Sequence, residues 1–432
     1  MNNSSNCFAR PDIHPRRRNH WWRDGRNADR SRKPSTLAMA MALTVTMALS
    51  TGCALAQAQT QNIAPTPPMG WSTWNHFHHD ISDALIRTQA DAMVASGMRD
   101  AGYVYVNIDG GWEGYRDEQG VLHPNANFPD MKALGDYLHS KGLKFGMYTG
   151  PGPRTCGGAP ASYGFEAQDA KMFASWGVDF LKYDLCSFRE IMKRESGGDV
   201  EKSDAMMKAA YEKMREDVAA TGRPILFSLC QYGWGHVWTW GPEVGASMWR
   251  TSGDISDTYD RMALNGFGEA GLAKYAGPGH WNDPDFLEVG NPGMTEDEQK
   301  THFSLWAMLA APLIAGNDLT AMTPETKSIL LNREVIAVDQ DALGQQGERV
   351  SKEGPLEVWA KPLQGGAMAV ALFNRTTGAT RMTLRLKDVG WKGRAEARDL
   401  WAHADAGVVD GEAMMTVPGH GVVMLELTRP RK

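Results

Sequence analysis

From residue 66 onward, the chain alternates between short apolar runs, rich in β-branched and aromatic residues, and longer stretches that resemble helices, such as 131–138, 166–174 and 203–220. Alternation over about 270 residues predicts a parallel sheet with helical crossovers. Eight runs qualify as strands: 67–74, 103–109, 143–149, 179–186, 224–230, 247–254, 280–288 and 313–318. Eight strands favour a (β/α)8 TIM barrel over an open sheet. No GxGxxG motif follows the first strand, which also argues against a dinucleotide-binding fold.

The pattern changes beyond about residue 345. Short strands now follow one another without an intervening helix and are joined by glycine-rich turns; they are 356–360, 367–373, 381–386 and 422–427. Such a run predicts a small C-terminal antiparallel β-sandwich. We therefore divide the chain into a leader (1–56), a catalytic barrel (57–344) and a sandwich domain (345–432).

The leader has the three-part pattern of a secretory signal. Residues 1–33 carry nine Arg or Lys and three Asp, and residues 34–56 are uncharged and largely apolar. The small residues Ala54-Leu-Ala56 then favour cleavage after Ala56. A single transmembrane anchor is the alternative, because about 20 apolar residues can also span a bilayer. The segment Leu49–Cys53 also weakly resembles a lipoprotein site, and Met39 and Met41 are alternative start codons.

Composition narrows the class of protein. The whole chain carries a net charge of −6 and residues 1–33 carry +6, so the chain without its leader carries −12. An acidic exported protein is not expected to bind nucleic acid or anionic lipid. Five cysteines are too few for a disulfide scaffold, and two of them lie in the leader. We expect a secreted or periplasmic protein in which one cysteine pair can bridge and one thiol remains.

Three carboxylates stand at the ends of predicted strands. Asp109, Asp184 and Asp254 close the second, fourth and sixth strands, so their side chains can converge over one axial pocket. For any one of these aspartates taken alone, the alternative explanation is that it caps the helix that follows its strand. Lys182 shares a strand face with Asp184 and is expected to lower its pKa and keep it ionised, as suits a nucleophile. Arg250 lies four residues before Asp254 and can orient a carboxyl or bind a hydroxyl.

Two carboxyls, one ionised and one able to donate a proton, are what glycoside hydrolysis requires. Tryptophans near strand ends can stack on a sugar, although each alone is as well explained as core; they are Trp71, Trp74, Trp112, Trp234 and Trp249. No HExxH, Walker loop or GxSxG occurs. The cluster His76, His78 and His79 lacks a usual metal-ligand spacing, which favours a solvated loop. We expect no metal and no cofactor.

The remaining cysteines also fall near strand ends. Cys156 lies past the third strand and Cys186 at the end of the fourth. Adjacent parallel strands are about 4.8 Å apart, so a bridge between these two is feasible. Cys230 ends the fifth strand and would be the unpaired thiol.

Five segments, taken in order, resemble the family 27 glycoside hydrolases, the melibiase-type α-galactosidases. They are Pro67-Pro-Met-Gly-Trp-Ser-Thr-Trp-Asn75, Asn107-Ile-Asp109, Leu181-Lys-Tyr-Asp184, Trp249-Arg-Thr-Ser-Gly-Asp254 and Gly279-His-Trp-Asn-Asp-Pro-Asp285. The resemblance runs from about residue 64 to the C-terminus. It implies a (β/α)8 barrel followed by an antiparallel β-domain, as the alternation of strands and helices already predicts.

The resemblance also implies roles for individual residues. Asp184 would be the nucleophile and Asp254 the general acid/base of a retaining mechanism, which requires carboxyls about 5–5.5 Å apart. Sugar contacts would come from Trp71, Asp109, Lys182 and Arg250. Cys156–Cys186 would be the family's disulfide, and Cys230 would occupy the place of a pocket cysteine. Gln231-Tyr232 would lie where the 2-substituent of the sugar is recognised, and its bulk favours a hydroxyl there.

Two positions depart from the family pattern. The second of two paired aspartates, which holds the galactose O4 and O6 hydroxyls, is Gly110 here, and a common Met is Phe286. The predicted function is hydrolysis of terminal α-D-galactosyl residues from carbohydrate chains. The alternatives are a β-L-arabinopyranosidase and a non-catalytic sugar-binding protein. We expect a carbohydrate substrate as the only partner, with no nucleic acid and no membrane beyond a possible lipid anchor.

Overall fold

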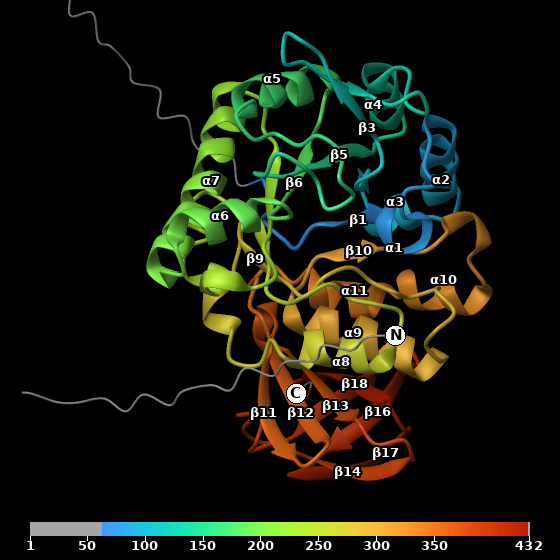
Figure 1. Cartoon of the computed structure of the whole chain (residues 1–432). Helices are drawn as coiled ribbons and strands as arrows, with labels where there is room; N and C mark the ends of the chain where they lie inside the picture. The colour runs from blue at the N-terminus through green and yellow to red at the C-terminus, as the bar shows by residue number, and fades with distance from the viewer. Residues whose placement is uncertain (1–62, 431–432) are drawn as a thin grey trace, which may run out of the picture. The chain divides into compact units, whose positions relative to one another are not determined.

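The computed structural model describes residues 63–430 (Figure 1). The leader, its cleavage site and Cys53 lie outside the described residues. Within the described part of the chain, no helix is both long enough and apolar enough to cross a membrane.

Eight parallel strands form the barrel sheet, in the order β10-β1-β2-β5-β6-β7-β8-β9. They are β1 (Met69–Ser72), β2 (Tyr105–Asn107), β5 (Lys144–Thr149), β6 (Phe180–Asp184), β7 (Leu226–Cys230), β8 (Met248–Arg250), β9 (Trp281–Asp283) and β10 (Leu313–Ala315). Each falls inside one of the eight predicted runs. The ring closes through Leu287, just after β9, whose N–H donates to Ile314 O at 2.8 Å and whose carbonyl accepts from Gly316 N at 2.9 Å. The predicted barrel is confirmed.

Helices connect the strands, as crossovers between parallel strands require. The helices are α1 (Trp74–Phe77), α2 (Asp83–Ala95), α3 (Met98–Ala101), α4 (Met131–Ser140), α5 (Glu166–Trp176), α6 (Phe188–Ser196), α7 (Val200–Ala220), α8 (Tyr259–Phe267), α9 (Glu296–Leu309), α10 (Pro324–Leu330) and α11 (Arg333–Asp339). The 3-10 turn η1 (Trp234–Thr239) follows β7, and a hairpin of β3 (Glu113–Arg116) and β4 (Leu122–Pro124) follows β2. The alternation of the sequence did not reveal this hairpin.

The C-terminal region is antiparallel, as predicted. One sheet has the order β11-β12-β13-β18-β15-β16, and β14 pairs with β17. The strands are β11 (Glu348–Glu353), β12 (Leu356–Pro362), β13 (Met368–Asn374), β14 (Thr380–Arg385), β15 (Ala395–Asp399), β16 (Ala404–Val409), β17 (Glu412–Val417) and β18 (Val422–Thr428). Four of these, β11 and β15–β17, add to the four expected from the sequence.

Helix α9 lies against both the barrel and the C-terminal sheet (Figure 1). A capping box starts it: the Thr295 side chain accepts from Glu298 N, and the Glu298 carboxylate accepts from Thr295 N. Near the C-terminal end of α9, Lys361 of β12 is fully buried. It donates from Nζ to Ala307 O at 2.9 Å and to Asp339 O at 3.5 Å. A buried cation therefore sits where the barrel helices meet the sandwich.

Candidate active site

A pocket opens at the carboxyl ends of the barrel strands, where such barrels carry their functional side chains. It is lined from seven of the eight strands and the loops that follow them. The lining residues are Trp74, Asn75, His79, Asp109, Gly110, Tyr148, Cys156, Gly157, Lys182, Asp184, Tyr232, Arg250, Asp254, Ile255, Asp285 and Phe286. The three carboxylates singled out in the sequence therefore share one pocket.

Asp184 is the last residue of β6 and is 5% exposed. The Tyr232 hydroxyl donates to its Oδ1 at 2.6 Å. Burial raises the pKa of Asp184, while the Lys182 ammonium and the Tyr232 hydrogen bond lower it in part. Lys182 does lower this pKa, as expected, but the pKa is raised on balance because the cost of desolvating the carboxylate outweighs the nearby charge.

Lys182 pairs with Asp109 rather than with Asp184. Its Nζ lies 2.8 Å from Asp109 Oδ2. Burial opposes the charge on Lys182, but the Asp109 carboxylate and other nearby anionic groups raise the pKa of the ammonium on balance. The same ammonium lies 5.1 Å from the centre of the Phe286 ring and 5.4 Å from that of Tyr148. Phe286 thus supplies a cation–π contact at the position where the sequence departs from the family pattern.

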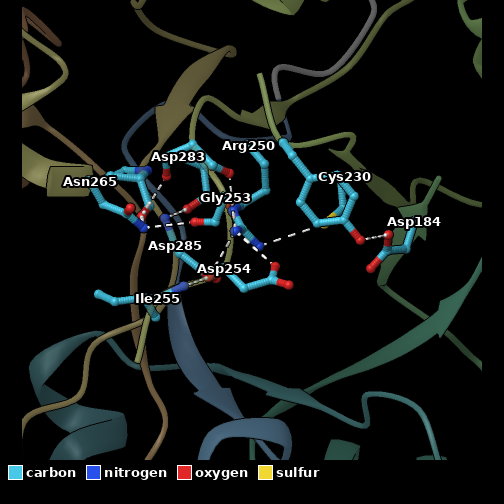
Figure 2. A network of polar contacts seen from close by, with 12 residues as sticks. Asp184, Cys230, Arg250, Gly253, Asp254, Ile255, Asn265, Asp283 and Asp285 are labelled. Atoms are coloured by element: carbon cyan, nitrogen blue, oxygen red, sulfur yellow. Dashed lines mark hydrogen bonds and ion pairs between the residues drawn. The ribbon is translucent and has the colours of Figure 1, made fainter. Parts of the chain in front are cut away.

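Asp254 lies on the loop after β8 and differs sharply from Asp184, since its side chain is 70% exposed. Arg250 donates from Nη2 to Asp254 Oδ1 at 3.1 Å, and the same nitrogen lies 2.8 Å from Asp285 Oδ2 (Figure 2). Asn265 donates to Gly253 O at 2.9 Å, and Arg261 donates from Nε to Asp254 O at 2.5 Å. The loop backbone is therefore fixed while the carboxyl stays accessible.

Asp285 is a site residue whose role the sequence did not reveal. Its φ of 93° is uncommon for a residue with a side chain. In this conformation its carboxylate reaches Arg250 and also accepts from Ile255 N at 2.8 Å (Figure 2). Asp285 thereby joins the loop after β9 to the loop that carries Asp254. Such strain at a pocket is typical of a functional constraint.

Three of the predicted sugar contacts lie behind the lining. Trp71 is fully buried and donates from Nε1 to Asn317 O at 2.7 Å. Cys230 and Gln231 are also fully buried, and Gln231 donates to Arg250 O at 3.3 Å. Burial raises the pKa of the Cys230 thiol, which keeps it neutral. Among the other tryptophans, Trp74 lines the pocket, Trp112 and Trp249 are core, and Trp234 is exposed outside it.

The two remaining cysteines are joined. Cys156 and Cys186 form a disulfide with their Cα atoms 4.9 Å apart, as the family resemblance implied. Their sulfurs lie beside Asp184, but as a disulfide they are not thiolate metal ligands. His76, His78 and His79 are exposed, and His76 lies 3.2 Å from the Asn291 amide oxygen. In residues 63–430 these histidines do not gather with other potential metal ligands.

Tyr148, Asn75 and Tyr232 complete the lining, and sequence reasoning gave the first two no role. Tyr148 lies next to the end of β5, and its hydroxyl is 3.2 Å from Cys186 Sγ. Asn75 donates to Glu288 at 2.5 Å. Tyr148 was marked only by its position near a strand end, which many structural residues share. Asn75 also lies in the first of the five segments that resemble the family, but that segment assigned it no role.

Comparisons with known proteins agree with this architecture. Residues 66–341 match the family model of α-galactosidase A, and residues 353–427 match that of the α-galactosidase C-terminal β-sandwich domain. An α-galactosidase of Cyamopsis tetragonoloba is 45% identical over 372 residues, covering 85% of this chain and 87% of the relative. An α-galactosidase of Coffea arabica is 48% identical over 369 residues, covering 84% and 94%.

Solved structures share the fold. α-Galactosidase I of Mortierella vinacea superposes with a TM-score of 0.78 at 34% identity, covering 84% of this chain and 97% of that one. A β-L-arabinopyranosidase of Geobacillus stearothermophilus gives a TM-score of 0.75 at 25% identity, covering 87% and 99%. In sequence, the three α-galactosidases named here are more similar to this chain than the arabinopyranosidase is, whereas the two TM-scores are close.

Proposed function

The chain belongs to the α-galactosidase A family and is a glycoside hydrolase that releases α-galactosyl residues, and we propose that Asp184 and Asp254 carry out this hydrolysis with retention of configuration. The observation that carries the proposal is the pairing of a buried carboxylate at a strand end with an accessible carboxyl on a neighbouring loop in one pocket. Glycoside hydrolysis with retention uses such a pair as nucleophile and acid/base.

In the first step, a carboxylate oxygen of Asp184 attacks the anomeric carbon. The bond from that carbon to the leaving oxygen breaks, and Asp254 transfers its proton to that oxygen. In the second step, Asp254 removes a proton from water, whose oxygen attacks the same carbon and displaces Asp184. The released galactose has the configuration of the substrate, and both carboxyls return to their starting states.

The surroundings of Asp184 suit a nucleophile. Burial makes the carboxylate more basic than a solvated one, and the Tyr232 hydroxyl fixes the direction of its Oδ1. The Asp109–Lys182 pair lies nearby and offers both an acceptor and a donor to sugar hydroxyls. Arg250, shared between Asp254 and Asp285, holds the acid/base side of the pocket.

The proposal extends to export. The disulfide fits an oxidising compartment, and the basic, apolar and small-residue segments of the leader have the order of a secretory signal. We expect N-terminal sequencing of the exported protein to begin at Gln57. A mature form that retains residues 1–56 would contradict cleavage.

The decisive experiment follows p-nitrophenyl α-D-galactopyranoside by proton NMR in the first minutes of hydrolysis. We expect α-galactose to appear before its β anomer, and p-nitrophenyl β-L-arabinopyranoside to be the poorer substrate. Initial release of β-galactose would rule out Asp184 as a nucleophile. A structure with bound galactose should also place the two carboxyls about 5–5.5 Å apart.

A further inference from the structure

A second hollow lies near the active-site pocket and is lined by residues of helices α6 and α7 and by the start of η1. Its volume is about 340 Å³, which falls in the range of about 300–1,000 Å³ typical of small-molecule sites. Its walls include Arg189 and Met192 of α6, Val200 and Asp204 of α7, and Trp234 of η1. We call this hollow the α6–α7 groove.

One side chain separates the α6–α7 groove from the reacting atoms. Tyr232 lines the active-site pocket and donates to Asp184, and the Arg189 guanidinium lies 5.0 Å from the centre of its ring. The same guanidinium lies 5.6 Å from the Trp234 ring, on the groove side. Arg189 is held in place by the Cys186 carbonyl, which accepts from its Nε at 3.1 Å. The groove therefore continues the wall of the pocket outward.

Trp234 is a large aromatic side chain left 46% exposed, and the backbone that carries it is tightly packed. Gly233 and Gly235 on either side have φ of 80° and 60°. A Cβ at Gly233 would lie 2.2 Å from Thr251 O, and one at Gly235 would lie 2.7 Å from Met207 Cε. The backbone of this loop is thus packed tightly between the β8 loop and α7, which fixes the position from which the indole projects.

The polar groups of the groove balance one another. Arg189 and Lys193 face Asp199 and Asp204, so the lining carries two positive and two negative side chains. Among residues 63–430, no Lys, Arg or His nitrogen lies within 4 Å of the Asp204 carboxylate, although the His236 side chain is close enough to lower its pKa in part. Its oxygens can accept from hydroxyl donors in the groove. An aromatic face flanked by balanced charges matches a pyranose ring, which is apolar on its C–H face and carries hydroxyls at its rim. A strongly anionic ligand would instead meet the two carboxylates.

We propose that the α6–α7 groove binds the neutral sugar rings on the leaving-group side of the scissile bond, with Trp234 as the stacking platform. This inference rests on the proposed function, because it assigns the departing oligosaccharide to a site next to Tyr232. It predicts that the enzyme prefers galactosyl oligosaccharides to substrates without a leaving sugar.

The test compares kcat/KM on two substrates in each variant. One is α-galactosyl fluoride, which has no leaving sugar, and the other is whichever of raffinose and 6-α-galactosyl-mannotriose the wild type hydrolyses faster. In Trp234→Ala we expect the ratio of oligosaccharide to fluoride to fall about tenfold, or about 1.4 kcal/mol. Trp234→Phe, which keeps an aromatic face, should retain most of the ratio. Tyr115→Ala is the matched control, because Tyr115 is exposed on β3, outside both sites.

The outcomes separate the two proposals. A change that merely disturbs the fold lowers both rates together and leaves the ratio unchanged; an unchanged ratio in Trp234→Ala overturns the groove proposal. Weaker binding of free mannotriose with an unchanged ratio would mark a separate glycan site, and it also overturns the proposal. Failure of the wild type to hydrolyse α-galactosyl fluoride would instead contradict the proposed function itself.

Discussion

Ionisable groups are buried in two regions of the molecule. One is the active-site pocket at the carboxyl ends of the barrel strands, here called the mouth, and the other is the junction where α9 and α11 meet β12. Of these two regions, only the mouth opens to a ligand. At the junction, burial raises the pKa of Asp339 to about 8 and lowers that of Lys361 to about 8. At the mouth, burial raises the pKa of Asp184 in the same direction. Lys361, however, is satisfied by backbone carbonyls inside the packing, whereas Asp184 faces the pocket. A perturbed pKa marks a catalytic group only where a substrate can reach it.

The largest expected effect is a loss of activity without a loss of stability, caused by a substitution at the mouth. Asp184→Asn should reduce turnover of α-galactosyl fluoride by at least about 1,000-fold, since it removes the nucleophile. The melting temperature should stay equal or rise, because a neutral amide escapes the desolvation that raises the pKa of the aspartate. Steady-state kinetics and a thermal melt check both parts. Turnover near that of the wild type would refute the assignment.

At the junction we expect the opposite result, a loss of stability without a loss of activity. Lys361→Met removes the donor to Ala307 O and the cation nearest Asp339, so we expect a loss of about 3 kcal/mol in the free energy of unfolding. Activity per folded molecule should not change. Urea denaturation measures the loss, and Lys132→Met is the control, because Lys132 pairs with Asp136 on the surface. Equal stability of the two variants would remove the contrast between mouth and junction.

A smaller effect sharpens the description of the mouth. Tyr232→Phe deletes the hydrogen bond to Asp184 Oδ1, which lowers the pKa of that carboxyl. Without it the pKa rises further, so the acidic limb of the kcat/KM profile should move to higher pH. We also expect kcat/KM at neutral pH to fall about tenfold, the scale of a hydrogen bond to a charged group. An unmoved pH profile would mean that Tyr232 does not act on Asp184.

The last expected effect concerns Glu269, which lies behind the β8 loop and accepts from the Thr251 hydroxyl. Burial raises its pKa to about 8. Between pH 4.5 and about 8 the folded state therefore keeps a proton that the unfolded state releases, and stability falls as pH rises through this window. Glu269→Gln has no such proton. Its free energy of unfolding should fall less steeply with pH, by up to about 1.4 kcal/mol per unit.

Denaturation curves at about pH 5.5 and pH 7.5 test this last expectation. If the wild type and Glu269→Gln show the same pH dependence, Glu269 is ionised in the folded protein. It would then belong with the open charges of the mouth rather than with the enclosed groups of the junction.

Local pattern predicted the barrel because its strands are apolar runs, and an α-helix follows each of them except β7, which is joined to β8 through the 3-10 turn η1. The same reasoning missed β16, whose residues 404–408 are all exposed and include Gly407, so nothing in its pattern marks a buried face. Strands β15 and β17 were missed as well. Their pairing with β18 and β14 depends on residues distant in the sequence.

The sequence predicted those site residues that stand at the ends of strands. Asp109, Asp184 and Asp254 were placed in one pocket from their positions alone. The role of Asp285 needed a left-handed backbone and a contact with Arg250, 35 positions earlier. Burial likewise decided the pKa of Asp184. Burial by the whole fold is not visible in the spacing of two positions between Lys182 and Asp184.

Gly110 shows how easily this pocket can vary over evolution. Its backbone is not in the left-handed region, and a Cβ there would make ordinary contacts with Tyr148 at 3.4 Å and Trp74 at 3.9 Å. The glycine codons GGT and GGC differ by a single base from the aspartate codons GAT and GAC. A lineage can therefore exchange glycine for aspartate in the wall of this pocket in one mutational step, and the added Cβ would not require the backbone to move.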